Sequence, residues 1–237
     1  MIVTILPETT KKPITLIGQR AAVCWNAKSN PEKDYKRGID CIISGHGRVM
    51  EFVNVEFTIE GMSARAMREL YTHIAGGPTR LQASTRYIDY SSASYFTPKS
   101  LESSTVYKKA MEAAIDAYDA LCEAGYPKED VANLLPLGMN SKMVEKCNLR
   151  MLQNLMGQRL CSRAYSEMRD FAKTLRDALI KYGADSGADD GRNEWKEVAE
   201  NLFVPKCKAV GFCTETRGSC GLMPSKDREW ITEDEQR

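Results

Sequence analysis

One short stretch constrains the fold more than any other part of the chain. From Val53 to Ile59, apolar side chains alternate strictly with the polar side chains of Asn54, Glu56 and Thr58. Successive side chains of a strand point to opposite faces, so this alternation predicts a strand that is buried on one side only. Two shorter apolar runs, residues 2–6 and 14–17, predict further strands.

Helical patterns dominate the rest of the chain. Gly61 is expected to end the main strand, and Ser63 to cap a helix behind it. Four later helices are expected. The first follows a cap at residue 104 or 105, the second starts at residues 127–130 and closes at 134–137, the third runs from residue 140 or 141 through 155, and the fourth from a Ser162 cap to residue 182. The first of these carries an expected inner face of Val106, Ala110, Ala113, Ala117 and Leu121. Residues 26–40 are polar and contain Pro31, which favours a loop.

Charge and composition exclude several classes of protein. The chain has 33 Lys and Arg against 32 Asp and Glu, a net charge of +1, and the two signs are interspersed. A broad nucleic-acid surface is therefore not expected. No apolar run is long enough to cross a bilayer, and the first residues lack the pattern of a secretory signal, so no membrane partner and a cytoplasmic protein are expected.

The eight cysteines are expected to be reduced, because disulfide frameworks belong to small secreted domains. A metal site could be suspected in the tail, at Cys207, Cys213 and Cys220. However, three thiols without a C-x2-C pair do not match a closed zinc site, and no metal is expected. The chain divides into a domain over residues 1–182, a polar linker over 183–194 and a cysteine-bearing tail over 195–237. Trp195 and Phe203 are expected to anchor this tail to the body or to a neighbouring subunit.

The stretch from His73 to Tyr95 gathers hydrogen-bond donors behind a break in the chain. Gly76, Gly77 and Pro78 interrupt any helix, because glycine loosens the backbone and proline removes a donor. Arg80, Gln82, Ser84, Arg86 and Tyr87 follow, and such side chains suit a phosphate and a heterocycle. An ordinary surface turn with solvated arginines is the alternative.

A second polar group interrupts an otherwise apolar helical segment. Asn148, Arg150, Asn154 and Arg159 lie among leucines and methionines. Buried polar atoms need partners, so this row indicates a subunit interface or, second, the wall of a ligand site.

Five blocks, in order along the chain, resemble the flavin-dependent thymidylate synthase family of the ThyX type. They are AVC at 22–24, SGH at 44–46 followed by EF at 51–52, STRY at 84–87 followed by YFTP at 95–98, LLPL at 134–137, and NLR at 148–150 with Asn154 and Arg159. The resemblance covers residues 21–175. It implies an α+β fold with an antiparallel sheet flanked by helices, assembled as a homotetramer with shared active sites.

The resemblance also implies the reaction and its residues. It is the methylation of dUMP to dTMP, with methylenetetrahydrofolate as one-carbon donor, FAD as hydride carrier and NADPH as reductant. The side chains implied at the FAD are Cys24, His46, Arg48, Glu51, His73, Asn148, Arg150, Asn154 and Gln158. Those implied at the nucleotide are Arg80, Gln82, Ser84, Arg86 and Arg159, of which Arg159, Ser84 and Gln82 are also implied in catalysis.

The chain departs from the family pattern at several positions. The family signature is Arg-His-Arg, seven residues and then serine, whereas this chain has Thr72-His73-Ile74 and nine residues before Ser84. Gln82 stands in place of a glutamate, and Ala132-Asn133 in place of an arginine before the Leu-Pro turn. Arg80 is hypothesised to replace one lost arginine. The departures leave two alternatives, a related enzyme that modifies another deoxypyrimidine nucleotide and a non-catalytic nucleotide-binding homologue.

Overall fold

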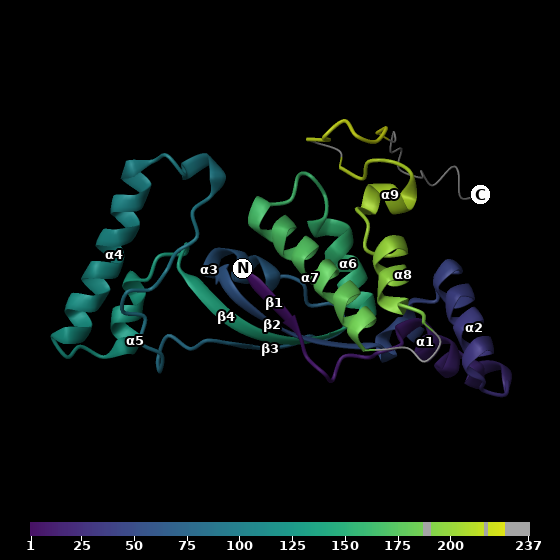
Figure 1. Cartoon of the computed structure of the whole chain (residues 1–237). Helices are drawn as coiled ribbons and strands as arrows, with labels where there is room; N and C mark the ends of the chain where they lie inside the picture. Colours follow the sequence, from purple (N-terminus) through teal and green to yellow (C-terminus); the bar gives the residue numbers. More distant parts are fainter. Residues whose placement is uncertain (187–190, 216–217, 226–237) are drawn as a thin grey trace, which may run out of the picture.

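A twisted antiparallel sheet forms the centre of the molecule (Figure 1). The computed structural model describes residues 1–186, 191–215 and 218–225. Within them, four strands lie in the order β1-β2-β4-β3. They are β1 Ile2–Ile5, β2 Asn54–Ser63, β3 Thr79–Gln82 and β4 Asn140–Asn148. Together with the helices described next, they confirm the expected α+β class.

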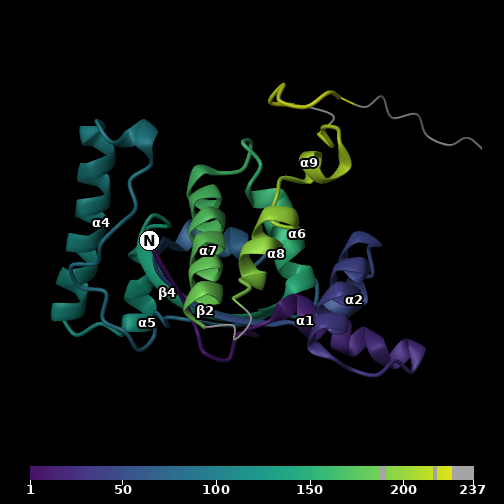
Figure 2. The same cartoon turned by 45° about the vertical axis from the view of Figure 1, so that its right-hand side comes forward.

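Helices α6, α7 and α8 lie side by side over one face of the sheet, with α1 and α2 at one end of the molecule and α4 and α5 at the other (Figures 1 and 2). None of the helices in the described ranges combines the length and apolar character needed to span a bilayer. The helices are α1 Pro13–Ala21, α2 Pro31–Ile43, α3 Ala64–Leu70, α4 Thr105–Glu123, α5 Lys128–Val131, α6 Leu149–Arg159, α7 Ser166–Asp185, α8 Glu194–Asn201 and α9 Lys206–Val210, with 3-10 turns η1 Ala22–Trp25, η2 Gly47–Phe52, η3 Lys99–Leu101 and η4 Ala132–Leu134.

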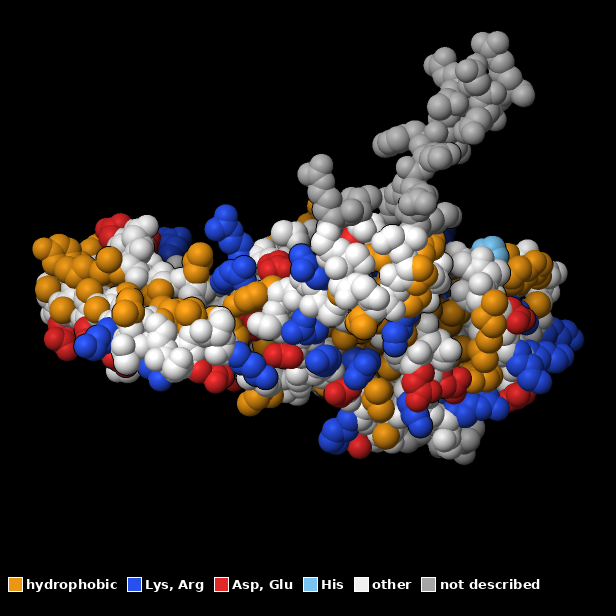
Figure 3. Space-filling model, turned by 90° about the horizontal axis from the view of Figure 1, so that it is seen from above, with side chains coloured by type: hydrophobic (Ala, Val, Ile, Leu, Met, Phe, Trp, Pro, Cys, Tyr) orange, Lys and Arg blue, Asp and Glu red, His pale blue; other side chains and the backbone are white. Residues whose placement is uncertain are grey.

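The arm formed by α4 and α5 has a small core of its own, made of Tyr90, Tyr118, Val131 and Met139. The expected inner face of α4 is wrong except at Leu121, because Met111, Ile115 and Tyr118 are buried instead. These larger side chains bury more apolar area than alanines do, so they decide which face turns inward. Four residues of the expected face are exposed, Val106 by 77%, whereas Leu121 packs against this small core. Figure 3 shows apolar side chains gathered over this end of the molecule.

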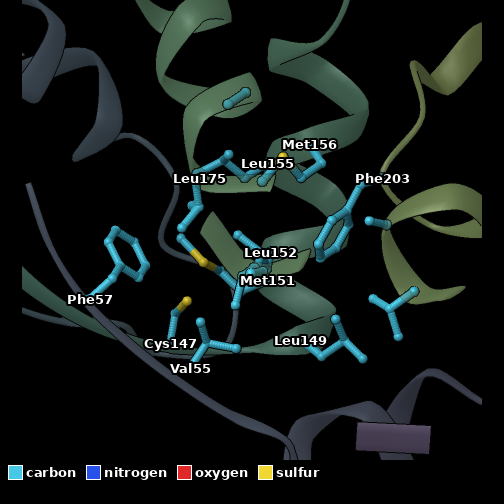
Figure 4. Close-up of a cluster of buried hydrophobic side chains, with 14 of the residues drawn as sticks. Val55, Phe57, Cys147, Leu149, Met151, Leu152, Leu155, Met156, Leu175 and Phe203 are labelled. Atoms are coloured by element: carbon cyan, nitrogen blue, oxygen red, sulfur yellow. The ribbon is translucent and has the colours of Figure 1, made fainter. Parts of the chain in front are cut away.

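The main core lies between the sheet and helices α6 and α7 (Figure 4). The predicted strand is confirmed, since Val53, Val55, Phe57 and Ile59 are all fully buried. Phe57 meets Phe171 of α7 with ring centroids 6.2 Å apart. Full burial of each of these side chains contributes about 1.5–3 kcal/mol, so this face helps to hold the sheet against α7.

The main strand does not end at Gly61. β2 continues to Ser63 through a register shift between Glu60 and Met62, and Gly61 takes a φ of +74° there. Glycine adopts this left-handed conformation without steric cost, which suits a bulge. The predicted cap is confirmed, because the Ser63 hydroxyl accepts a hydrogen bond from the Ala66 N–H at 3.1 Å.

Two segments near the N-terminus are helical, contrary to expectation. Residues 14–17 lie in α1 rather than in a strand, and residues 26–40, expected as a loop, contain most of α2. In both helices a proline occupies the first turn, where its missing N–H costs nothing. The side chain of Asn30 caps α2 by accepting from Glu32 N at 3.1 Å.

The helix expected from residue 140 is wrong over its first half. Residues Asn140–Asn148 form β4, in which Ser141, Met143, Glu145 and Cys147 are buried in strict alternation. A spacing of four, as between Met143 and Cys147, fits both two strand repeats and one helical turn, which explains the error. The helix begins only at Leu149.

The last long helix and the tail complete the core. The apolar stripe of α7 is confirmed by the burial of Met168, Phe171, Ala172, Leu175 and Leu179. The helix starts at Ser166, however, and Ser162 does not cap it. Trp195 and Phe203 are buried in the main core, so the tail is anchored to the body of its own chain. Residues 187–190 of the expected linker lie outside the described residues, and the proposed division into domain, linker and tail stays a prediction.

Candidate active site beside helix α6

A cavity of about 590 Å³ runs along α6 and brings together four of the side chains implied at the flavin, Glu51, Asn148, Arg150 and Asn154. Its opposite wall comes from the tail, through Leu202, Val204, Lys206 and Ala209. The remaining lining residues are Ala75, Gly76, Met151, Gln153 and Gly157. The volume lies in the range of pockets that enclose cofactors and other small molecules.

Asn148 joins the start of α6 to the loop of the central stretch. Its Oδ1 accepts from the Met151 N–H at 2.9 Å and so caps the helix, while its Nδ2 donates to the Gly76 carbonyl at 3.4 Å. Gly76 has a φ of +81°, and a Cβ there would lie only 2.6 Å from Asn148 Nδ2. Glycine at 76 is therefore required both by its backbone and by the close approach of this amide.

Arg150 lines the same cavity and contacts the 3-10 turn η2. Its guanidinium pairs with Glu51 at 2.6 Å, and both side chains remain more than a third exposed. A Cβ at Gly47 would lie 3.1 Å from Arg150 Nε, so the turn before Glu51 packs directly against the guanidinium. The two residues that the resemblance places at the flavin are thus neighbours, although 99 positions separate them in the sequence.

A second cluster, outside the cavity beside α6, is formed by His73, Arg159 and Glu69. Arg159 Nε donates to His73 Nε2 at 2.8 Å, and its Nη1 pairs with Glu69. Burial lowers the pKa of His73 to about 4, and the positive charges of Arg159 and Arg80 act in the same direction. His73 is therefore neutral near pH 7, with its Nε2 as the acceptor and its proton on Nδ1. A cavity of about 170 Å³ joins His73 to Asn154 and Gln158.

Arg80 is turned into the protein, where Glu145 compensates its charge. The guanidinium lies 2.9 Å from one Glu145 oxygen and 3.1 Å from the other, with 5% of the Arg80 side chain and none of the Glu145 side chain exposed. It also donates to the His73 carbonyl at 2.8 Å. Burial raises the pKa of Glu145, and Arg80 opposes that effect. The hypothesis that Arg80 reaches the nucleotide stays a prediction.

The other residues implied at the nucleotide lie along β3 and the chain after it. Gln82 Nε2 is 3.5 Å from Ser141 Oγ, Ser84 Oγ accepts from Arg86 N at 3.2 Å, and Arg86 pairs with Glu129 of the arm at 2.8 Å. None of the three lines the cavity beside α6.

Three residues implied at the flavin, Cys24, His46 and Arg48, are exposed on the 3-10 turns or the residues next to them and also lie outside that cavity. A single chain therefore brings together only part of the implied site.

Sequence reasoning missed the contribution of the tail. Lys206 and Ala209 lie on α9 and Leu202 and Val204 just before it, yet all four face α6. Gly157 of α6 faces this wall, since a Cβ there would lie in ordinary contact with Lys206 at 3.8 Å and with the Val204 carbonyl at 3.9 Å. The signal in the sequence was the pair Trp195 and Phe203, whose burial draws the tail onto the body.

The chain is similar to known proteins over most of its length. Residues 5–182 match the family model described as thymidylate synthase complementing protein. The flavin-dependent thymidylate synthase of Pyrococcus abyssi is 29% identical over 241 residues, covering 94% of this chain and 92% of the relative. That of Geobacter sulfurreducens is 30% identical over 233 residues, covering 91% and 92%.

A solved structure shares the fold. The crystal structure of thymidylate synthase X from Helicobacter pylori with FAD and dUMP aligns with a TM-score of 0.63 at 22% identity, covering 77% of this chain and 94% of that one. By the match of the family model over most of its length, and by relatives that are similar almost from end to end, this chain belongs to the thymidylate synthase complementing protein family, the flavin-dependent thymidylate synthases.

Proposed function

We propose that this protein is a flavin-dependent thymidylate synthase, which methylates dUMP to dTMP with methylenetetrahydrofolate as one-carbon donor and NADPH as reductant. The observation that carries the proposal is the cavity along α6, where Asn148, Arg150 and Asn154 of the resembling block line one wall. Its relatives from Pyrococcus abyssi and Geobacter sulfurreducens bear the name of this activity.

The lining of the cavity fits a flavin. Amides of Asn148, Gln153 and Asn154 offer donors and acceptors for the polar edge of a ring system, and Arg150 and Lys206 offer positive charge for a pyrophosphate. Met151, Leu202 and Val204 supply apolar surface for a flat aromatic body. Bound FAD would supply the hydride of the reaction.

The protein's own groups would bind and polarise the nucleotide. Arg159 uses Nε and Nη1 for His73 and Glu69, which holds the guanidinium in one orientation and leaves Nη2 for the substrate. A guanidinium beside a uracil carbonyl stabilises the negative charge that develops as the ring becomes nucleophilic. Neutral His73 serves here as an acceptor that orients Arg159, and not as an acid near pH 7.

A thiol nucleophile is not part of the proposal. Burial raises the pKa of Cys147, which lies on β4 just before α6, well above its ordinary value, and the charge of Glu145 adds to this. A thiol of this kind carries little thiolate and is chemically inert.

We further propose that the complete site is shared between subunits of a homotetramer. Gln82, Ser84 and Arg86 lie outside the cavity of their own chain, so a second subunit would have to bring them to Arg159 and the flavin. The exposed apolar face of α4, with Val106, Ala110, Ala113 and Ala117, is suited to burial in such an assembly. The cytoplasmic location stays a prediction.

The test begins with the visible spectrum of the purified protein, reconstituted with FAD, desalted and titrated with dUMP. We expect flavin bands that survive desalting and shift with dUMP, followed by dTMP formation when methylenetetrahydrofolate and NADPH are added. An Arg150→Ala variant should lose the flavin, whereas Arg176→Ala, which removes a partly exposed arginine on α7, should keep it.

The alternatives make different predictions. Flavin binding with turnover of another deoxypyrimidine nucleotide, and none of dUMP, would favour the altered specificity suggested by Gln82. Nucleotide binding by a protein that retains no flavin would refute the synthase and favour the non-catalytic homologue.

A further inference from the structure

Four of the eight cysteines meet in one cavity, away from the main core. The cavity has a volume of about 380 Å³ and lies between the end of α6, the turn after it and the tail. Cys161 comes from the turn, Cys207 from α9, and Cys213 and Cys220 from the segment behind α9. The fold gathers these thiols, since the spacing of the tail cysteines alone carries no metal or redox motif.

These thiols differ from the cysteines of the core in access to solvent. Cys41 and Cys147 are buried, and burial raises the pKa of both thiols. Cys220 is exposed, while Cys161, Cys207 and Cys213 are partly exposed. Oxidants in solution can therefore reach the cavity thiols and not the core thiols.

The contacts of Cys220 favour its thiolate. A hydrogen bond from the Ser162 side chain lowers the pKa of the Cys220 thiol, the backbone of Leu222 adds to this, and the positive charge of Arg163 acts in the same direction. Arg163 also packs against the tail, because a Cβ at Gly218 would lie 2.8 Å from its Nη2. Positive charge and hydrogen-bond donors around an accessible thiol are the conditions that make a cysteine reactive.

The contact between Ser162 and Cys220 brings the neighbouring residue Cys161 to the same cavity as Cys220. Cys161 directly precedes Ser162, whose side chain bonds to Cys220, and both cysteines line the cavity. The tail segment is held in place by a hydrogen bond from Cys213 N to the Pro224 carbonyl at 2.7 Å. Among the described residues, no three His, Cys, Asp or Glu side chains are placed to hold a metal ion, so the cluster is considered for the chemistry of the thiols themselves.

We infer that Cys220 and Cys161 form a hydroperoxide-sensitive modification site that joins the tail to the turn after α6. The Cys220 thiolate attacks one oxygen of hydrogen peroxide, the O–O bond breaks, hydroxide leaves, and the sulfur is oxidised to a sulfenic acid. The Cys161 sulfur then attacks the sulfenic sulfur, and the S–O bond breaks. The proton of Cys161 leaves with the hydroxyl group as water, and a disulfide remains.

The test follows this bond by mass spectrometry in the full-length protein. Trypsin releases each cavity thiol in its own peptide, LCSR with Cys161, CK with Cys207, AVGFCTETR with Cys213 and GSCGLMPSK with Cys220. After one equivalent of hydrogen peroxide and alkylation of the remaining thiols, we expect LCSR linked to GSCGLMPSK within a monomer, a loss of two titratable thiols, and recovery of both with dithiothreitol.

Three variants sharpen the test. Cys220→Ser should abolish the thiol loss, and Cys161→Ser should let a sulfenic acid accumulate on Cys220, which dimedone traps. Cys24→Ser removes an exposed thiol outside the cavity and should leave the linked peptide unchanged. A thiol titre that peroxide does not change, a bond to Cys207 or Cys213 instead of Cys161, or a disulfide between two chains would each overturn the inference.

Discussion

His73 offers the most direct test of the electrostatics around Arg159. The chain has two histidines, His73 buried beside Arg159 and His46 exposed, so one variant of each forms a matched pair. We expect His73→Gln to remove a pH dependence of folding that His46→Gln leaves in place. Glutamine retains a side-chain acceptor for Arg159 but does not titrate.

The direction of this pH dependence follows from the lowered pKa of His73. Because the pKa of His73 is about 4 in the folded protein and near its ordinary 6.5 in the unfolded chain, the unfolded chain binds more protons between these values. The free energy of unfolding therefore falls as the pH falls from 6.5 to 4, and His73 contributes no pH dependence above 6.5. Each pH unit between 6.5 and 4 lowers the free energy of unfolding by about 1.4 kcal/mol, so the whole interval lowers it by roughly 3 kcal/mol.

The measurement is urea unfolding followed by tryptophan fluorescence at pH 4.5 to 8, at one fixed protein concentration. Histidine-labelled protein adds an NMR titration of the two imidazoles. The difference in stability between wild type and His73→Gln should shrink as the pH falls, whereas His46→Gln should keep the fall in stability that His73 causes. A His73 resonance that titrates near 6.5, or equal slopes for wild type and His73→Gln, would refute the reasoning.

Three further substitutions test the supports of the site. Glu145→Gln leaves the Arg80 cation buried without its partner, so we expect a loss of about 3–5 kcal/mol in urea unfolding. Glu60→Gln, at the exposed pair with Lys142, is the control. Asn148→Ala removes the cap of α6, so it should lower the free energy of unfolding by about 1 kcal/mol. It should also weaken FAD binding, which flavin fluorescence measures. An unchanged affinity for FAD would contradict a role for this amide. Gly76→Ala should lower stability by more than about 1 kcal/mol and also weaken FAD binding, whereas Gly77→Ala, also at positive φ but in open space, should cost less.

The sequence predicted the elements correctly where its apolar pattern fits only one kind of secondary structure. The alternation at Val53–Ile59 matches the buried face of β2, and the stripe on α7 matches its buried face. The pattern failed where two periods coincide, as at Met143 and Cys147, and where alanines outnumbered the larger residues that are buried, as on α4. Local capping chemistry at Asn30 and Pro31 was present in the sequence, but it was interpreted as a loop.

Part of the candidate site was also predictable. The block around Asn148, Arg150 and Asn154 lies together on one cavity with Glu51, as the resemblance implied. The burial of Arg80 against Glu145 could not be predicted, because the sequence pattern assigned the segment that contains Glu145 to a helix, whereas it forms β4. The wall formed by Leu202, Val204 and Lys206 had no signal of its own.

Patterns along the chain were enough to predict the class of fold, the family, and the side chains that the site has available. These properties depend on local periodicity and on short blocks, which are encoded in neighbouring residues. The tertiary structure alone decided which groups meet: Glu51 with Arg150, Arg80 with Glu145, and Cys220 with the turn at Ser162. Such contacts join segments far apart in the chain, and only the packing of the whole core fixes the distance between them.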